Sequence, residues 1–208
     1  MSKAYIALIA DATASRELAP ERRARLQRAL RAALPDLNRR WRKALAARFA
    51  VTLGDELQCL LSTALPIWEI GHAVRSRFPD VEWTVACGRG PVATPLGKGV
   101  TAPEVDGPCF HNARAAMETA KRNRLLLAFG GFPSGVHAFV HYYSALYWSW
   151  TPRQRRVANL LRWSESALNV ARALHIHRSA VSHLKRRMAW PLVAAGDKML
   201  RAVLVEAL

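Results

Sequence analysis

The chain has 208 residues, of which 51% are hydrophobic, so it can bury a core and is not a fully disordered protein. Its 31 lysines and arginines exceed its 15 acidic residues, and the formal net charge of +16 favours nucleic acid as partner, with an anionic membrane surface second. The three cysteines lie far apart and include no CxxC pair, which argues against a zinc ribbon or a disulfide framework and favours a reducing, cytoplasmic location.

The region up to residue 61 is predicted to contain a strand, two helices and a hairpin. An apolar run predicts a buried strand over residues 5–10, which ends at Asp11. Apolar residues at helical spacing predict a helix over 20–34, which we expect Pro35 to end. The other elements predicted here are a helix over 36–47 and two strands, 49–53 and 57–61, joined by a tight turn at 54–56.

The region from residue 66 to residue 132 continues this mixed pattern. Helices are predicted over 66–78 and within 107–122, and strands over 81–87 and 125–129. A turn is predicted at 88–90 because two of its three residues are glycine. Strands and helices in this irregular order predict an α+β fold, in which helices cover an antiparallel sheet.

The last third of the chain is predicted to be helical throughout. Residues 133–150 are aromatic and predict a helical connector, and their proline and histidines make a membrane span a poor interpretation. Beyond the connector, helices are predicted over 152–162, 164–174, 178–188 and from 191 to the end. We therefore divide the chain into an α+β domain (1–132), a connector (133–150) and an all-α domain (151–208).

Positive charge is densest in this last domain. Residues 151–208 hold eleven lysines and arginines against three acidic residues, a net charge of +8 in 58 residues. The first 150 residues carry the same net charge over more than twice the length. This density indicates where a polyanion would bind.

Residues 169–186 have the spacing of two short helices that cross at a tight turn. Ala171 supplies the small residue needed where the helices cross, and Ile176 is expected to plug the turn. Four further apolar positions are expected to anchor the two helices: Val170, Leu174, Val181 and Leu184. The segment resembles helix-turn-helix transcription regulators, except that His175 stands where the family usually has glycine; histidine tolerates positive φ better than most residues.

The outward face of the second helix is the predicted DNA-binding surface. Short polar side chains there can reach base edges, while arginine and lysine can reach phosphates. The predicted contact residues are Arg178, Ser179, Ser182, His183, Lys185 and Arg186. A plain helical bundle with a solvated basic face is the alternative interpretation of the same pattern.

Acidic residues stand at two predicted strand ends in the α+β domain. Asp11 follows the first strand, and Asp55 and Glu56 lie at the hairpin tip. If these strands are neighbours, the carboxylates lie side by side and can hold one or two Mg²⁺ or Mn²⁺ ions together with a nucleotide's phosphates. The alternative is ordinary turn and cap chemistry, because aspartate and Gly-Asp are frequent turn formers.

Three segments, residues 4–16, 52–58 and 106–114, resemble the SatD family of bacterial proteins. More distantly they are similar to class III nucleotide cyclases, which implies a ferredoxin-like, cyclase-like sheet with a metal–nucleotide pocket. On this resemblance Asp11 and Asp55 match the metal aspartates, and Asn112 and Arg114 are candidate catalytic residues. The arginine expected four residues after Asn112 is Ala116, and the base-reading lysine expected at 50–52 is absent, so the catalytic set is incomplete.

Three functional hypotheses follow. The first is a cytoplasmic DNA-binding regulator with a degenerate cyclase-like domain that binds a nucleotide or metal ligand. The second is an enzyme, a metal-dependent nucleotide cyclase or nucleotidyltransferase. The third is a scaffold whose connector, residues 133–150, mediates homodimer formation.

Overall fold

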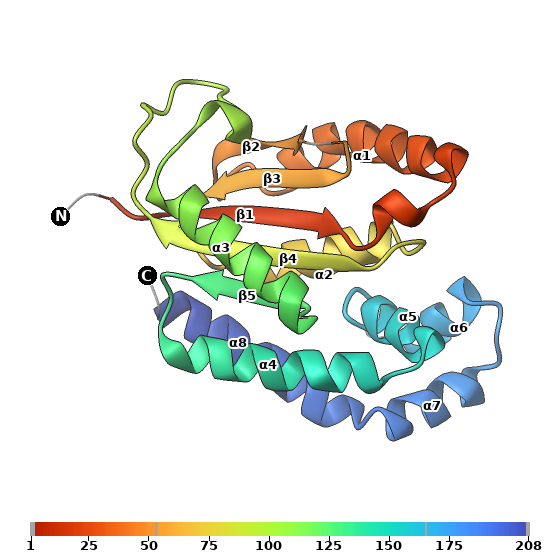
Figure 1. Ribbon diagram of the computed structural model, residues 1–208. Helices are drawn as coiled ribbons and strands as arrows, with labels where there is room; N and C mark the ends of the chain where they lie inside the picture. The colour runs from red at the N-terminus through yellow and green to blue at the C-terminus, as the bar shows by residue number, and fades with distance from the viewer. Residues whose placement is uncertain (1–2, 53, 165, 207–208) are drawn as a thin grey trace.

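The computed structural model describes residues 3–52, 54–164 and 166–206. Five strands form one sheet in the order β2-β3-β1-β4-β5 (Figure 1). They are β1 (Tyr5–Ala12), β2 (Leu45–Thr52), β3 (Glu56–Leu61), β4 (Trp83–Gly90) and β5 (Leu127–Gly130). The first four strands pair antiparallel, whereas β5 pairs parallel with β4. The α+β prediction is therefore confirmed, with one parallel strand that we did not predict.

Helices cover both faces of the sheet. Helix α1 (Pro20–Arg40) and helix α2 (Ile67–Arg77) pack on the face to which Ile6, Leu8 and Ala10 of β1 contribute. Helix α3 (Pro108–Asn123) packs on the opposite face, against Ala7 and Ile9. Successive residues of a strand point to opposite faces, so a central strand covered on both faces is apolar throughout.

Gly88 of β4 lets α3 lie directly on the sheet. A Cβ atom at this position would stand 2.1 Å from the carbonyl oxygen of Cys109 and 2.2 Å from the backbone nitrogen of Ala113. Only glycine allows the backbones to approach so closely. The prediction of a turn at residues 88–90 is therefore wrong: these glycines belong to β4, which continues to Gly90.

Pro35 lies inside α1, so the prediction that it ends the helix is wrong. A proline inside a helix costs about 3 kcal/mol, but Leu30, Ala33 and Leu37 on both sides of it are buried in the core. Asn38 also exchanges hydrogen bonds with the backbone of Phe49, at 2.7 and 3.2 Å, which fixes the last turn of the helix against β2. The helix predicted over 36–47 is consequently the end of α1 plus the start of β2. The strand predicted over 49–53 is part of β2, and its predicted last residue, Leu53, lies outside the described residues.

The C-terminal part is helical, as predicted. It comprises α4 (Ser134–Ser149), α5 (Pro152–Leu161), α6 (Ala167–Ala173), α7 (Arg178–Arg187) and α8 (Trp190–Glu206). Helix α4 lies alongside β5 and α8, and α5 to α7 form the far end of the molecule (Figure 1). Within the described ranges, no helix is both long enough and apolar enough to cross a membrane.

One apolar cluster joins the helical part to the sheet. It contains Trp68 of α2 and Val85 of β4 together with Val157, Val181 and Leu200 of the C-terminal helices. The ion pair between Arg201 of α8 and Glu69 of α2 reinforces this contact. Within the helical part, the nearly buried pair Arg162–Asp197, at 2.8 Å, joins the end of α5 to α8. The helices from α5 onward therefore pack against the α2 side of the sheet.

Candidate functional site

The carboxylates of Asp11 and Glu56 lie next to each other on the sheet face that α3 covers. Asp11 on β1 is the direct cross-strand partner of Glu56 on β3. Directly opposed residues of an antiparallel pair project to the same face. The structure thus brings together two of the three acidic residues singled out in the sequence.

Each of these two carboxylates has a cationic partner on α3. Arg114 binds both oxygens of Glu56, with Nη1–Oε2 at 2.6 Å and Nη2–Oε1 at 2.9 Å. Lys121, two helical turns further, pairs with Asp11 at 2.7 Å. Glu56 Oε1 also accepts hydrogen bonds of 2.6 Å from Thr52 and from Gln58.

The surroundings move the two pKa values in opposite directions. Burial raises the pKa of Asp11 above 3.8, and the charges of Glu56 and Asp55 add to this effect, although Lys121 opposes it. Burial would also raise the pKa of Glu56, but hydrogen bonds from Arg114, Thr52 and Gln58 outweigh it and leave the pKa below 4.5. Glu56 is therefore held as a carboxylate more firmly than Asp11.

Asp55 does not take part in this pairing. It lies in the hairpin turn, where its carboxylate accepts a hydrogen bond from the hydroxyl of Ser15. In the part of the chain that the structure describes, no group of three or more His, Cys, Asp and Glu side chains is arranged to hold a metal ion. Lys121 and Arg114 supply positive charge beside Asp11 and Glu56.

The two candidate catalytic residues of α3 lie apart from each other. Asn112 donates a 2.8 Å hydrogen bond to the backbone oxygen of Arg89, near the end of β4. Arg114, two residues further along the helix, pairs with Glu56 instead. The two side chains diverge because residues two apart on a helix point in different directions. The structure brings Arg114 to the carboxylates and leaves Asn112 outside them.

Helices α6 and α7 are joined by a short turn and packed through the residues that the spacing predicted. Val170, Ala171 and Val181 are buried, and Leu174, Ile176 and Leu184 are partly buried against the same core. His175 has a φ of 51°, the left-handed conformation expected for a residue in this turn.

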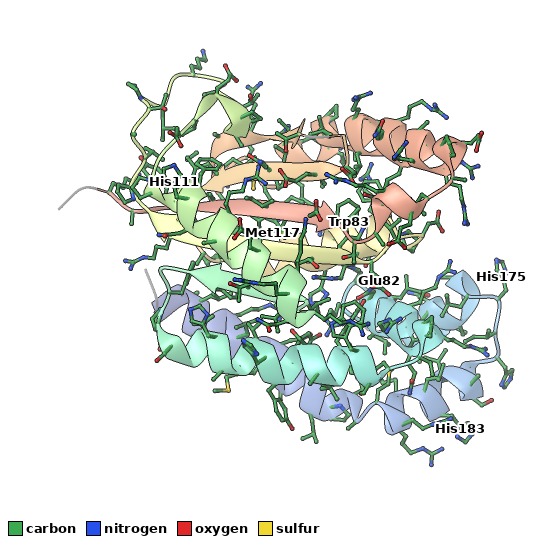
Figure 2. The ribbon with its side chains drawn as sticks, viewed as in Figure 1. Glu82, Trp83, His111, Met117, His175 and His183 are labelled. Atoms are coloured by element: carbon green, nitrogen blue, oxygen red, sulfur yellow. The ribbon has the colours of Figure 1, made fainter. Side chains whose placement is uncertain are left out.

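The opposite face of α7 is open to solvent. The exposed residues among the predicted contacts are Arg178, Ser179, Ser182, His183 and Arg186, and Lys185 is half-buried. Figure 2 shows His175 and His183 at the outer edge of this part of the molecule. In the described chain, the side chains of Arg178 and Lys185 make no ion pair, so their charge is available to a partner.

Two functional contacts were missed at the sequence level. His177 caps α7, with its Nδ1 accepting a 3.3 Å hydrogen bond from the backbone nitrogen of Ser179. Lys121 pairs with Asp11, and its spacing of seven residues from Arg114 was the available signal, because such residues share a helix face. Lys121 lies outside the three segments that carry the family resemblance, and His177, although inside residues 169–186, is neither an apolar packing position nor on the outward face of the second helix.

Comparison with known proteins gives one family. The model described as the SatD family matches residues 5–124, from the start of β1 to the end of α3. No curated protein matches the chain. The matched segment contains Asp11, Asp55, Glu56, Asn112 and Arg114, whereas α4 to α8 lie beyond it.

Proposed function

The chain belongs to the SatD family, and from this premise we propose that it is a DNA-binding regulatory protein with a degenerate cyclase-like domain. The observation that carries the proposal is the outward face of α7, which is exposed and basic and presents the short polar side chain of Ser179 near the start of the helix. Its partner helix α6 and the turn between them have the packing that a helix-turn-helix requires. The all-α region 151–208 is the DNA-binding part in this proposal.

Contact with DNA phosphates gives the charge of this region a function. Arg178 and Arg186 lie at the two ends of α7, where arginines can reach the backbone on either side of a groove. Ser179 and Ser182 lie between them, on the exposed side that would meet base edges. The turn before α7, with His175 in the left-handed conformation and Ile176 packed against the core, fixes the position of this face.

The ferredoxin-like and cyclase-like character of residues 1–132 is part of the same proposal. The order β1-α1-β2-β3-α2-β4 and the strand arrangement 2-3-1-4 support a ferredoxin-like core. In this interpretation Lys121 neutralises Asp11, one of the two residues that match the metal aspartates of cyclases, and Arg114 neutralises the neighbouring Glu56. We also propose a cytoplasmic location, supported by three unpaired, buried cysteines.

The test is a gel-shift titration with duplex DNA at about 50 mM and about 200 mM salt, because phosphate contacts make affinity fall steeply with salt. Substituting both Arg178→Ala and Arg186→Ala should weaken binding and reduce the slope of log affinity against log salt by about 2. Arg122→Ala, an exposed arginine on α3, is the matched control and should bind like the parent chain. Absence of binding at the lower salt concentration would refute the proposal.

A second candidate function is a metal-dependent nucleotide cyclase or nucleotidyltransferase. One observation favours it: two adjacent carboxylates with pKa values displaced in opposite directions are a common arrangement in acid–base sites. Incubation with ATP or GTP plus Mg²⁺ or Mn²⁺ tests this function. It is eliminated if no product forms, or if the Asp11→Asn variant forms product at the same rate.

A second copy of the chain is the partner that we propose for the outer face of α4. Helix α4 contains no Asp, Glu, Lys or Arg, yet its Tyr142 is 78% exposed, and neighbouring α8 exposes 74% of Leu192 and 60% of Met199. Two adjacent helices about 25 Å long offer about 500 Å² per partner, which reaches the roughly 1,000 Å² total of a specific interface. A homodimer would also present two copies of α7 to DNA.

We therefore expect sedimentation equilibrium to give twice the 23.1 kDa mass of one chain. The Tyr142→Lys variant should sediment as a monomer, because a buried unpaired charge is costly at an interface. A parent chain that stays monomeric at all accessible concentrations refutes the dimer.

A further inference from the structure

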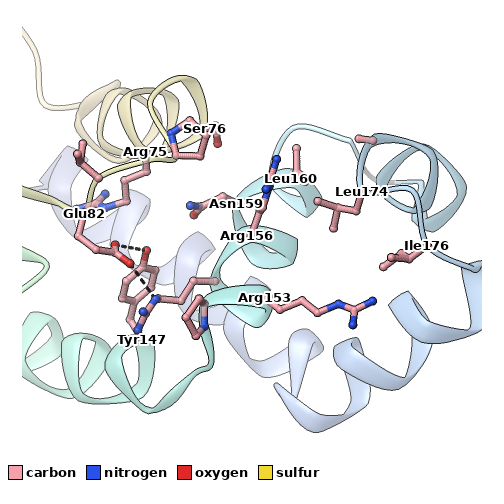
Figure 3. A pocket seen from close by; sticks show the side chains of 15 residues that line it. Arg75, Ser76, Glu82, Tyr147, Arg153, Arg156, Asn159, Leu160, Leu174 and Ile176 are labelled. Carbon is pink, nitrogen blue, oxygen red and sulfur yellow. Dashed lines mark hydrogen bonds and ion pairs between the residues drawn. The ribbon is translucent and has the colours of Figure 1, made fainter. Parts of the chain in front are cut away.

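A pocket of about 510 Å³ lies between α2 with its connection to β4 and the C-terminal helices α4 to α6 (Figure 3). One wall is the end of α2, with Arg75, and the connection to β4, with Glu82; the facing wall is α5 with the turn that holds Ile176. Its volume falls within the roughly 300–1,000 Å³ of small-molecule sites. The pocket is thus built jointly by the SatD-matched segment and by the helices beyond it.

The lining of the pocket is strongly basic. It contains four arginines, Arg75, Arg153, Arg155 and Arg156, and a single acidic residue, Glu82. Glu82 is paired with Arg155 at 3.1 Å and accepts a 3.2 Å hydrogen bond from the hydroxyl of Tyr147. Three of the four arginines are therefore left without a carboxylate among the described residues.

Arg153 and Arg156 project from consecutive turns of α5. Both are exposed, and neither side chain makes a hydrogen bond or ion pair in residues 3–52, 54–164 and 166–206. In Figure 3, Arg153 extends along the pocket toward Ile176. These two guanidinium groups have all their N–H donors available to an incoming anion.

Arg75 adds a buried charge to the wall. It is only 2% exposed, and its Nη2 donates to the backbone oxygens of Trp83 and Leu126 at 3.1 and 2.7 Å. Its Nε and Nη1 have no hydrogen-bond partner, and neither does Oδ1 of Asn159, another lining residue. Burial lowers the pKa of Arg75, which reflects the cost of a charge removed from water without a counter-ion.

Apart from Ser76 and Asn159, the rest of the lining is apolar or aromatic. Its apolar members are Pro79, Val81, Pro152, Leu160, Ala173, Leu174 and Ile176, and the ring of Tyr147 adds an aromatic surface. A ligand that fits both the basic and the apolar part of the lining carries an anionic group on a flat or apolar body. Arginine binds phosphate through parallel N–H···O bonds, so several arginines around one pocket favour a phosphate group.

We propose that this pocket binds a small organic phosphate, with the phosphate on Arg153 and Arg156 and the body against the apolar wall. The positive field of Arg75 adds to the attraction for the phosphate. Around Asp11 and Glu56 the cations Lys121 and Arg114 are already paired with carboxylates, whereas Arg153 and Arg156 have no carboxylate partner among the described residues, so the arginine pocket is the better nucleotide site in this chain. Because its walls belong to α2 with its connection to β4 and to the helices next to α7, the ligand favours one arrangement of these elements relative to each other. This last step rests on the proposed DNA-binding function.

Isothermal titration calorimetry with AMP, inorganic phosphate and adenosine tests the site. AMP and phosphate should bind, AMP more tightly, while adenosine, which lacks the phosphate, should bind at least tenfold more weakly than AMP. The combined Arg153→Ala and Arg156→Ala variant should lose at least tenfold in AMP affinity, and Arg122→Ala should not. Absence of binding by both AMP and phosphate at millimolar concentration, or AMP binding unchanged in the double variant, would overturn the site.

A gel shift with and without saturating AMP then tests the coupling. AMP should change DNA affinity at least threefold in the parent chain and leave it unchanged in the Arg153→Ala, Arg156→Ala variant. If AMP binds and DNA does not bind at all, the proposed function fails and the pocket stands. If DNA binds with the same affinity in both conditions, the coupling fails and both binding functions stand.

Discussion

The carboxylate cluster under α3, formed by Asp11 and Glu56, and the outer face of α7 differ in whether their charges are paired. At the cluster, Glu56 and Asp11 each meet a cation from the same helix, and Glu56 is almost completely buried. On α7, Arg178, Arg186 and Arg187 are exposed and Lys185 is half-buried, and none of the four pairs with an acidic residue in the described chain. Removing one partner of a charge pair inside the fold destabilises that fold, whereas charge left unpaired at the surface is available to a binding partner.

The largest effect should come from breaking the pair at Glu56. Arg114→Ala leaves a carboxylate that is 3% exposed with only two neutral hydrogen-bond donors, and should lower the free energy of unfolding by about 3 kcal/mol. Urea denaturation measures this change. Arg122→Ala, on the same helix, should stay within about 0.5 kcal/mol of the parent chain. Equal stability of the two variants would mean that the Glu56 pair contributes nothing to the fold.

The next effect is a difference in pH dependence between the two carboxylates. The pKa of Glu56 is lowered on folding, so its contribution to stability is present above its ordinary value of 4.5 and is lost as pH falls through the lower folded value. The Glu56→Gln variant should therefore lose about 1–2 kcal/mol at pH 7 and much less near pH 3. Unfolding by urea from pH 3 to pH 7 measures both.

Asp11 has the opposite sign. Its pKa is raised on folding, so its contribution is present below its ordinary value of 3.8 and is lost as pH rises through the higher folded value. Asp11→Asn should change stability at pH 7 by less than about 1 kcal/mol, because the relief from burying a charge offsets the loss of the Lys121 pair. A large loss at pH 7 would contradict the direction of this shift.

The smallest effect concerns the turn before α7. His175 holds a φ of 51°, which costs a residue with a side chain about 1 kcal/mol relative to glycine. His175→Gly should therefore raise the free energy of unfolding by up to about 1 kcal/mol, less the entropy that glycine gains in the unfolded chain. Thermal unfolding of the variant measures it, and a decrease in stability would show that the histidine side chain makes a contact worth more than the strain.

Local patterns in the sequence predicted much of the fold. The apolar run at the first strand, the Gly-Asp turn of the hairpin and the helical periodicity of the last third all report short-range preferences and burial. The packing positions Val170, Ala171 and Val181 were predicted for the same reason, since a short helix must turn one face toward the core. Whether α7 binds DNA and whether Asp11, Asp55 and Glu56 hold a metal stay predictions.

Long-range contacts explain what the sequence patterns missed. Pro35 reads as a helix break, but the burial of Leu30, Ala33 and Leu37 outweighs its cost. The glycines at 88 and 90 read as a turn, but they are the surface on which α3 lies. In both cases a preference of about 1–3 kcal/mol was overridden by packing that no local window contains.

The sequence by itself determined the alternation of strands and helices, the SatD resemblance and the excess of positive charge, because these depend on residue type and spacing along the chain. Only the tertiary structure decided which charges are neutralised. It pairs Arg114 with Glu56, more than fifty residues away along the chain, and Lys121 with Asp11, more than one hundred residues away. Among the described residues it leaves Arg153 and Arg156 without an ion pair beside a pocket. Electrostatic interactions depend on distance in space and on burial, and the folded chain alone sets both.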